Sequence, residues 1–108
     1  KKDMIKSGGE NVSSLEVEKC IFNHEKVLDV AVVGLPDPRW IEAVTAVVVP
    51  RPGVTLTPEE IITHCKAHLA GYKVPKRVLI RDQIPKTATG KTLKYVLRQM
   101  LVEELERG

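Results

Sequence analysis

The segment VLDVAVVGLPDPRWIEAVTAVVVP, residues 27–50, contains the two apolar runs that decide the fold class. The runs VLDVAVVGL (27–35) and TAVVVP (45–50) are rich in β-branched residues, which favour strands. Two prolines end the first run, and the second is apolar enough to be covered on both faces. Because a connection this short allows antiparallel pairing, we predict a long β-hairpin across residues 36–44.

The residues before this hairpin predict a second, shorter hairpin and a helix. Residues 3–14, DMIKSGGENVSS, have two short strand-like runs around a glycine turn. Ser13 and Glu16 have the spacing of a capping box, so we expect a helix that runs to about Asn23. Its apolar positions, which we expect to be buried, are Val17, Cys20 and Ile21.

The residues after the hairpin predict two more helices around one strand. Thr57, Pro58 and Glu60 mark a helix start with a capping box, and Gly71 is expected to end that helix. RVLIRD (77–82) reads as a strand, and a last helix is expected from about Thr92. The apolar stripes expected on the two helices are Ile61, Ile62, Cys65 and Leu69, and Leu93, Val96, Leu97, Met100, Leu101 and Leu105.

These elements predict an α+β fold with a small three-stranded mixed sheet, helices packed on it and an N-terminal two-stranded ribbon. The third strand returns through a helix and is expected to lie parallel to one of the others. The length of 108 residues fits one domain, residues 1–108. The opening KKDMIKSGGENV carries structural residues from the start, which suggests a piece of a longer protein.

Composition indicates an ordinary globular chain. Apolar residues make up 43% and charged residues 29%, so intrinsic disorder is not expected. No apolar run is long enough for a transmembrane segment. Cys20 and Cys65 stand in helical patterns and read as small core residues, which makes a reducing, cytoplasmic location the default expectation.

Positive charge is concentrated near the C-terminus. The net charge is +3, but residues 73–98 contain eight Lys or Arg and one acid, Asp82. Such a segment attracts phosphates and other anions, although a solvated basic face has the same composition. A stand-alone module that binds RNA or another anion is therefore an alternative to an enzyme, and two aromatic–cation pairs are few for a nucleic-acid surface.

PKTATGKT (85–92) resembles the end of a phosphate-binding P-loop, but Pro85 occupies the position of its first glycine. Proline has no N–H for the phosphate cradle, so a true P-loop is not expected. Gly90 permits a sharp turn, and the loop looks mobile. Lys91 lies near a predicted helix N-terminus, where anions are favoured. We therefore expect a loop that delivers one lysine, Lys91, to an anion held by another domain.

Two other features suggest ligand contacts. Gly8 and Gly9 read first as a hairpin turn, and alternatively as a bare strand edge along which an extended ligand can lie. Trp40 follows Arg39, and Tyr72 precedes Lys73, each pair in a predicted loop. An aromatic ring beside a cation is a platform for a nucleotide base, or simply an anchor for the loop.

His64 and His68 in HCKAH have the helical spacing of two zinc ligands. No third ligand follows at metal spacing, and Cys65 stands where a metalloprotease has glutamate. We therefore expect no metal site. His24 follows a helix end and reads as a cap or a surface group.

The segments KKDMIKSGGENVSSLEVE, VLDVAVVGLPDPRW, YKVPKRV and PKTATGK, in this order, resemble the C-terminal domain of adenylate-forming enzymes, in particular the acyl-CoA synthetases. The resemblance covers essentially the whole chain. It implies a partner, the large N-terminal domain, which holds most of the site for ATP, Mg²⁺ and the carboxylic acid. It also implies that the chain alone is inactive, and that no nucleic acid is bound.

The resemblance implies a reaction in two steps. A carboxylate attacks the α-phosphate of ATP to give an acyl-adenylate, and coenzyme A then displaces AMP to give a thioester. The family's C-terminal domain rotates between the steps. Lys91, with Thr89 and Gly90 in the same loop, corresponds to the lysine loop that enters the active site for adenylation.

For the thioester step, the resemblance places Gly8 and Gly9 along the channel for the pantetheine arm. It places Trp40, Tyr72 and Lys76 near the nucleotide end of coenzyme A. Lys2 corresponds to the family's hinge position.

Two residues depart from the family's pattern, Ile41 where glycine is usual and Val74 where some members have a basic residue. They leave the turn after Trp40 and the coenzyme A contacts open. A same-family alternative is a peptide synthetase adenylation domain that loads a carrier protein, and SGGEN favours the coenzyme A enzymes.

Overall fold

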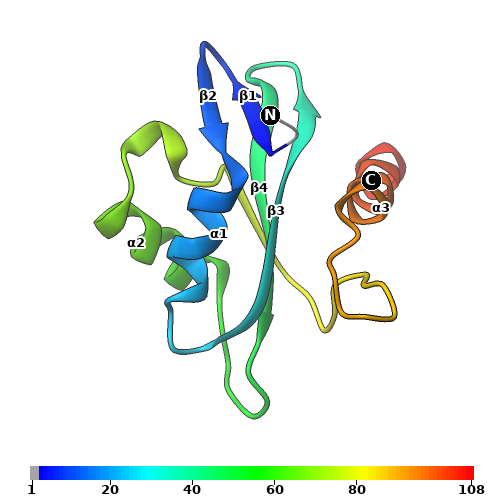
Figure 1. Cartoon of the computed structure of the whole chain (residues 1–108). Coiled ribbons are helices and arrows are strands. Elements are labelled where there is room, and N and C mark those ends of the chain that lie inside the picture. Colours follow the sequence, from blue (N-terminus) through cyan, green and yellow to red (C-terminus); the bar gives the residue numbers. More distant parts are fainter. Residues whose placement is uncertain (1–2) are drawn as a thin grey trace.

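The computed structural model describes residues 3–108, in which two layers of helices enclose one mixed sheet (Figure 1). The central hairpin is formed by β3 (Val27–Asp37) and β4 (Ile41–Pro50), which pair antiparallel. This confirms the predicted hairpin, but its strands are longer than expected. The two strands pair up to Asp37 and Ile41, so the turn between them contains only residues 38–40.

Both faces of β4 are buried, as its apolar sequence predicts. Alternate residues point to opposite faces of a strand, so Val44 and Val48 pack toward α1 and α2, whereas Val47 and Val49 pack toward α3. Figure 1 shows α1 and α2 on one side of the sheet and α3 on the other. The fully enclosed β4 explains how a chain with few aromatic residues still forms a core.

The strand β5 (Arg77–Ile80) pairs parallel with β4, which confirms the predicted mixed sheet. The N-terminal ribbon consists of β1 (Met4–Ser7) and β2 (Glu10–Ser13), also as predicted. It is not separate, however, because β1 pairs with β4 at Ser7 and Ile41 and joins the same sheet. Five strands therefore form one sheet among the described residues.

A glycine on β3 permits this junction. A Cβ atom added at Gly34 would lie 2.9 Å from Ile5 Cγ2 and 3.0 Å from Glu42 Cδ. Glu42 in turn accepts a hydrogen bond from the Lys6 N–H at 2.9 Å. Ribbon and hairpin thus meet at a point where only glycine leaves enough room.

The helix α1 (Ser14–Phe22) begins where the sequence predicts, with Ser13 as its N-cap. The Ser13 hydroxyl accepts from the Glu16 N–H at 3.3 Å, which is one half of the predicted capping box. The Glu16 carboxylate instead pairs with Lys73 at 3.0 Å. Tertiary contact therefore replaces the second half of the box.

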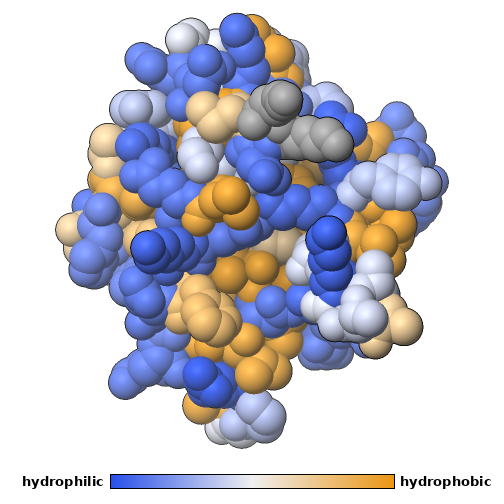
Figure 2. Space-filling view, in the orientation of Figure 1, coloured by the Kyte–Doolittle hydropathy of each residue, from blue (hydrophilic) through white to orange (hydrophobic). Residues whose placement is uncertain are grey.

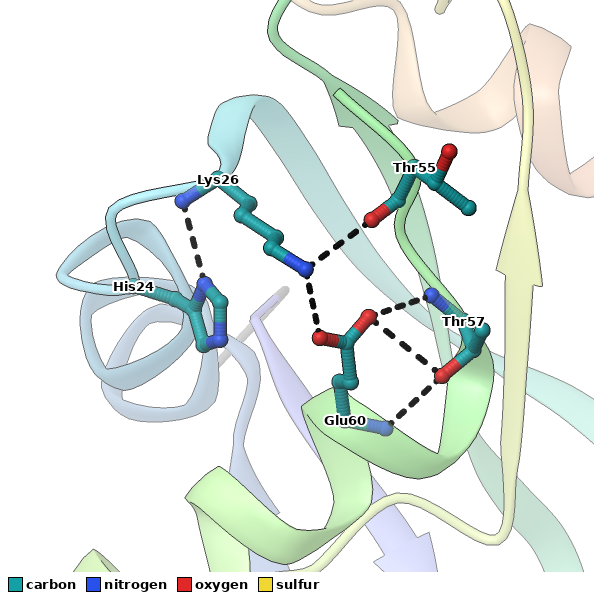
Figure 3. Close-up of polar contacts among 5 residues, drawn as sticks. All are labelled: His24, Lys26, Thr55, Thr57 and Glu60. Carbon is teal, nitrogen blue, oxygen red and sulfur yellow. Dashed lines mark hydrogen bonds and ion pairs between the residues drawn. The ribbon is translucent and has the colours of Figure 1, made fainter.

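The helix α2 (Pro58–His68) has both halves of its predicted capping box. The Thr57 N–H donates to Glu60 Oε1 at 2.9 Å, and the Glu60 N–H donates to the Thr57 hydroxyl at 3.2 Å (Figure 3). The predicted end at Gly71 is wrong, because the backbone already becomes extended at Leu69, which packs against the core. Gly71 begins a short 3₁₀ helix, η1 (Gly71–Lys73).

The two cysteines meet at the contact between α1 and α2. Cys65 is buried, as predicted, whereas Cys20 is half-buried. Burial raises the pKa of both thiols, and that of Cys65 reaches about 12. Both thiols are therefore protonated at neutral pH in the absence of a ligand.

The helix α3 (Lys94–Arg107) begins two residues later than predicted. Its expected apolar face is only partly correct. Leu97 and Leu101 are buried against the sheet, whereas Met100 and Leu105 are 46% and 45% exposed. The helix touches the sheet along a narrow stripe, so residues at the edges of the predicted face remain in solvent. None of the helices found between residues 3 and 108 combines the length and the apolar character that a bilayer crossing requires.

Candidate functional site

The Lys91 loop, residues 85–93, is closed by its own hydrogen bonds rather than loosely organised. Gly90 has φ +90°. Its N–H donates to the Thr87 carbonyl at 2.9 Å, and the Lys91 N–H donates to the Thr87 hydroxyl at 3.0 Å. The Thr87 hydroxyl also lies 3.1 Å from that of Thr89. The loop is therefore a hydrogen-bonded turn, and the N–H groups of Thr87, Gly90 and Lys91 are used inside it rather than for a phosphate cradle.

The Lys91 side chain does not lie at a helix N-terminus, since α3 begins only at Lys94. Lys91 is exposed at the tip of the turn. The helix dipole therefore contributes little to its surroundings, and the charge available to a ligand is that of the ammonium group.

Most of the basic segment is neutralised within the fold. Six of its eight basic residues form ion pairs, and two, Lys76 and Lys91, have no carboxylate partner among residues 3–108. The expected strongly positive segment is thus reduced to two free cations. The pairs are Lys73 with Glu16, Arg77 with Asp37, Arg81 with Glu104, Lys86 with Asp29, Lys94 with Asp3 and Glu18, and Arg98 with Glu42.

Lys91 stands at the edge of a groove of about 530 Å³ between α1 and α3. Apolar side chains, among them Leu15 and Val33, line much of it. Lys94 also faces the groove, but its ammonium pairs with Glu18 at 2.8 Å. Figure 2 shows apolar atoms in a recess near the middle of this face. Lys91 therefore supplies an unpaired positive charge at the edge of a mainly apolar groove.

A second candidate cluster lies at the turn end of the sheet. The Gly8 N–H donates to the Trp40 carbonyl, and the Lys76 ammonium lies 4.5 Å from the centroid of the Trp40 ring. Gly8 has φ +62°, and a Cβ atom there would lie 3.4 Å from Trp40 Cε3. The structure thus brings together three of the predicted residues, Gly8, Trp40 and Lys76. The left-handed backbone at position 8 favours glycine, and the indole ring packs within van der Waals distance of it.

Asp37 positions this cluster, although it is not among the site residues predicted from the sequence. Its Oδ1 accepts from the N–H groups of Arg39 and Trp40 at 2.8 and 3.1 Å, and its Oδ2 pairs with Arg77 at 3.0 Å. The Arg39 N–H bond, followed by the Trp40 bond and the Arg77 charge, lowers the pKa of Asp37. An aspartate side chain often accepts a hydrogen bond from the backbone N–H two residues later, which is a known turn signal. The segment DPRW could therefore have revealed the role of Asp37.

Ile41 shows how the departure from the family pattern is accommodated. Its φ is +72°, in the left-handed region that glycine occupies without strain. It is the one non-glycine residue with positive φ among residues 3–108. The turn after Trp40 therefore forms with isoleucine at position 41, and the left-handed conformation of this residue strains the backbone.

The remaining predicted residues differ in their surroundings. Tyr72 is 42% exposed in η1, which packs against β2, and its neighbouring cation is Lys73. Gly9 has open space where a side chain would be. Val74 is 8% exposed and belongs to the core, so it offers no solvent-facing position for a ligand contact. The predicted hinge residue, Lys2, lies outside the described residues.

The lysine loop and the Trp40 cluster occupy different parts of the molecule. In Figure 1 the turns of both hairpins lie at the top end of the sheet, whereas the loop after β5, coloured orange, lies at the lower right before α3. The candidate residues thus form two sites, one around Lys91 and one around Trp40.

Comparisons with known proteins identify the family. The sequence model of the AMP-binding enzyme C-terminal domain matches residues 16–91. A peroxisomal trans-cinnamate:CoA ligase of Petunia hybrida is 48% identical over 92% of this chain and 17% of its own length. A long-chain-fatty-acid–CoA ligase of Yersinia pestis is 47% identical over 100% of this chain and 18% of its own length.

A solved structure of a Mycobacterium tuberculosis fatty acyl CoA synthetase superposes with a TM-score of 0.90 and 44% identity, covering 95% of this chain and 20% of that one. The chain therefore spans about a fifth of the length of the relatives it matches. It has their α+β fold. The chain belongs to the AMP-binding enzyme C-terminal domain family.

Proposed function

We propose that this chain is the mobile C-terminal domain of an ATP-dependent acid–CoA ligase. In the first step a carboxylate oxygen attacks the α-phosphorus of ATP, and pyrophosphate leaves. In the second step the coenzyme A thiol attacks the acyl carbon, and AMP leaves. The observation that carries the proposal is the free Lys91 ammonium at the tip of a hydrogen-bonded turn, in a segment whose other cations, except Lys76, are paired.

Lys91 is proposed to stabilise the negative charge that develops on the α-phosphate during adenylation. A charge placed before the reaction stabilises a transition state without a reorganisation cost. The internal hydrogen bonds of Thr87 supply that placement, because they fix the backbone at Gly90 and Lys91. Thr89 and Gly90 are proposed to shape the loop around the adenylate. Since hydrogen bonds close the loop, Lys91 is proposed to reach or leave the site by movement of the whole domain.

The cluster of Gly8, Trp40 and Lys76 is proposed to act in the thioester step. Gly9 leaves open space at the hairpin turn, which suits passage of a thin pantetheine arm. The Lys76 ammonium over the indole ring provides both a flat apolar face and a positive charge for a nucleotide. Tyr72 is proposed to contact the nucleotide end of coenzyme A from η1, and Lys2 to act as the hinge.

ATP is proposed to bind mainly on the larger N-terminal part, with Mg²⁺. The groove beside Lys91 is not suited to the metal, because its carboxylate, Asp3, faces Lys94 at 3.7 Å. The carboxylic acid is also proposed to be chosen by that part. Relatives named for trans-cinnamate and for long-chain fatty acids are nearly equally similar to this chain. The sequence of this chain therefore does not correlate with the acid that the relatives are named for.

Acid–CoA ligation is favoured over loading of a carrier protein because the relatives described above carry CoA ligase names. A stand-alone anion- or RNA-binding module is less favoured, because six of the eight basic residues are internally paired. A cytoplasmic location remains our proposal, although the relative from Petunia is named as peroxisomal.

The test is a half-reaction assay of the full-length protein that contains this chain, since the chain alone is expected to be inactive. Lys91→Ala is expected to slow pyrophosphate exchange by about 10²–10³-fold, because one preorganised charge is lost. Thioester formation from a supplied acyl-adenylate should change much less.

The matched control is Lys66→Ala, which removes an exposed lysine of α2 and should leave both steps unchanged. Equal losses in both half-reactions for Lys91→Ala would contradict its proposed role. Absence of pyrophosphate release from the unmodified protein, across aromatic and aliphatic acids, would contradict the proposed function itself.

A further inference from the structure

Three side chains with metal-binding chemistry converge where α1 packs on α2. One donor atom each of Cys20, His64 and His68 lies within 4.8 Å of the others. From the sequence no metal site is expected, because no third ligand follows the histidine pair at metal spacing. The third candidate comes instead from α1, 44 residues earlier than His64, and only the packing of the two helices brings it there.

Hydrogen bonds to backbone carbonyls fix the proton on each imidazole. His64 Nε2 lies 2.8 Å from the Cys20 carbonyl, and His68 Nδ1 lies 2.8 Å from the His64 carbonyl. A carbonyl only accepts, so these nitrogens carry the protons. His64 Nδ1 and His68 Nε2 then keep free lone pairs. Metal-binding histidines in proteins are held in the same way, with the second nitrogen bonded to a carbonyl or carboxylate.

The third histidine of the region, His24, does not share this property. Its ring lies 5.1 Å from that of His64. Its Nδ1, however, accepts the Lys26 N–H at 3.1 Å (Figure 3), so a neutral His24 carries its proton on Nε2. His24 therefore has no free lone pair and serves as a matched control.

We propose that Cys20, His64 and His68 bind a zinc ion that links α1 to α2. One sulfur and two imidazole nitrogens form a donor set that suits Zn²⁺, and a water completes the tetrahedron. His68 is exposed and Cys20 half-buried, so the ion enters from the surface. Binding displaces the thiol proton of Cys20 into solvent.

Zinc binding requires the cluster to contract and the free nitrogens, His64 Nδ1 and His68 Nε2, to face the Cys20 sulfur, because the donor atoms now lie within 4.8 Å of one another. Zinc–nitrogen and zinc–sulfur bonds of about 2.0–2.1 and 2.3 Å place tetrahedral ligands about 3.3–3.6 Å apart. Rotation of the exposed His68 side chain, at the last residue of α2, can supply much of this change. The site lies on the sheet face opposite α3 and does not depend on the proposed ligase activity.

The test is titration of the reduced, metal-free 108-residue chain with Co²⁺, followed by displacement with Zn²⁺. One equivalent of Co²⁺ is expected to give tetrahedral visible bands and a thiolate-to-cobalt charge-transfer band, and Zn²⁺ should abolish both. Zn²⁺ should also raise Tm, because it binds only the folded arrangement.

Cys20→Ser should remove the charge-transfer band, whereas Cys65→Ser should retain it. His68→Gln, a surface change, should weaken zinc binding by at least about tenfold. His24→Gln should bind like the unmodified chain. Absence of a charge-transfer band, its survival in Cys20→Ser, or equal losses in His24→Gln and His68→Gln would each overturn the proposal.

Discussion

Ile41 combines a left-handed backbone with a β-branched side chain, a combination that strains the backbone. Its side chain is 62% exposed, so replacement sacrifices little burial. Ile41→Gly should raise the free energy of unfolding by about 1 kcal/mol. Relief of about 1–2 kcal/mol of strain exceeds the entropic cost of glycine, about 0.5–1 kcal/mol.

Urea denaturation of the two chains measures this difference. Ile41→Val retains both the β-branch and the strain, and it should lie within about 0.5 kcal/mol of the unmodified chain. An Ile41→Gly variant that is no more stable than the unmodified chain would show that the strain is relieved in another way.

Asp37 gives the Trp40 turn a dependence on pH. Its folded-state pKa is lowered, first by the Arg39 N–H bond. Because the pKa is lower in the folded state, the ionised Asp37 carboxylate stabilises the fold above its unfolded-state pKa of about 3.9. This stabilisation is lost as the pH falls through the folded-state pKa. Urea midpoints should therefore fall less steeply below about pH 4 for Asp37→Asn than for the unmodified chain. Parallel pH profiles would contradict the role of this carboxylate.

At the scale of elements, Gly34 controls how the N-terminal ribbon joins the central hairpin. A methyl group at this position would meet Ile5 Cγ2 and the Glu42 side chain at 3.0 Å or less. Gly34→Ala should lower the free energy of unfolding by about 1–3 kcal/mol, the usual cost of overpacking. Chemical denaturation measures it.

Gly9→Ala is the matched control, because open space surrounds that position and its φ is not positive. Its stability should change by no more than about 0.5 kcal/mol. Equal effects of the two substitutions would show that the contact between ribbon and hairpin is not the cause.

For the whole molecule, the separation of the two candidate sites predicts separable defects. Gly9→Trp places a large ring in the open space at the turn between β1 and β2, whereas the loop between β5 and α3 lies toward the other end of the sheet (Figure 1). In the full-length protein it should slow thioester formation by about 10²-fold, because the thiol is misplaced. Pyrophosphate exchange should be nearly unchanged. A loss of exchange in this variant would indicate that one face serves both steps.

The sequence alone predicted the elements wherever the signal was local. The hairpin of residues 27–50, the capping box of Thr57 and Glu60, and the turn at Gly90 all follow from propensity, capping and φ. The same local patterns failed at Gly71, because core packing of Leu69 ended α2 earlier. They also placed the start of α3 too near Lys91.

Residue types and short spacings were enough to predict the α+β class, the family resemblance, and Lys91 and the glycines as candidate site residues. Three-dimensional packing was needed to show that the ribbon joins the main sheet, that Lys76 and Lys91 are the unpaired cations of the segment, and that Cys20 meets His64 and His68. These outcomes depend on contacts between residues that are distant along the chain. Helix and strand periodicity carries no information about such contacts.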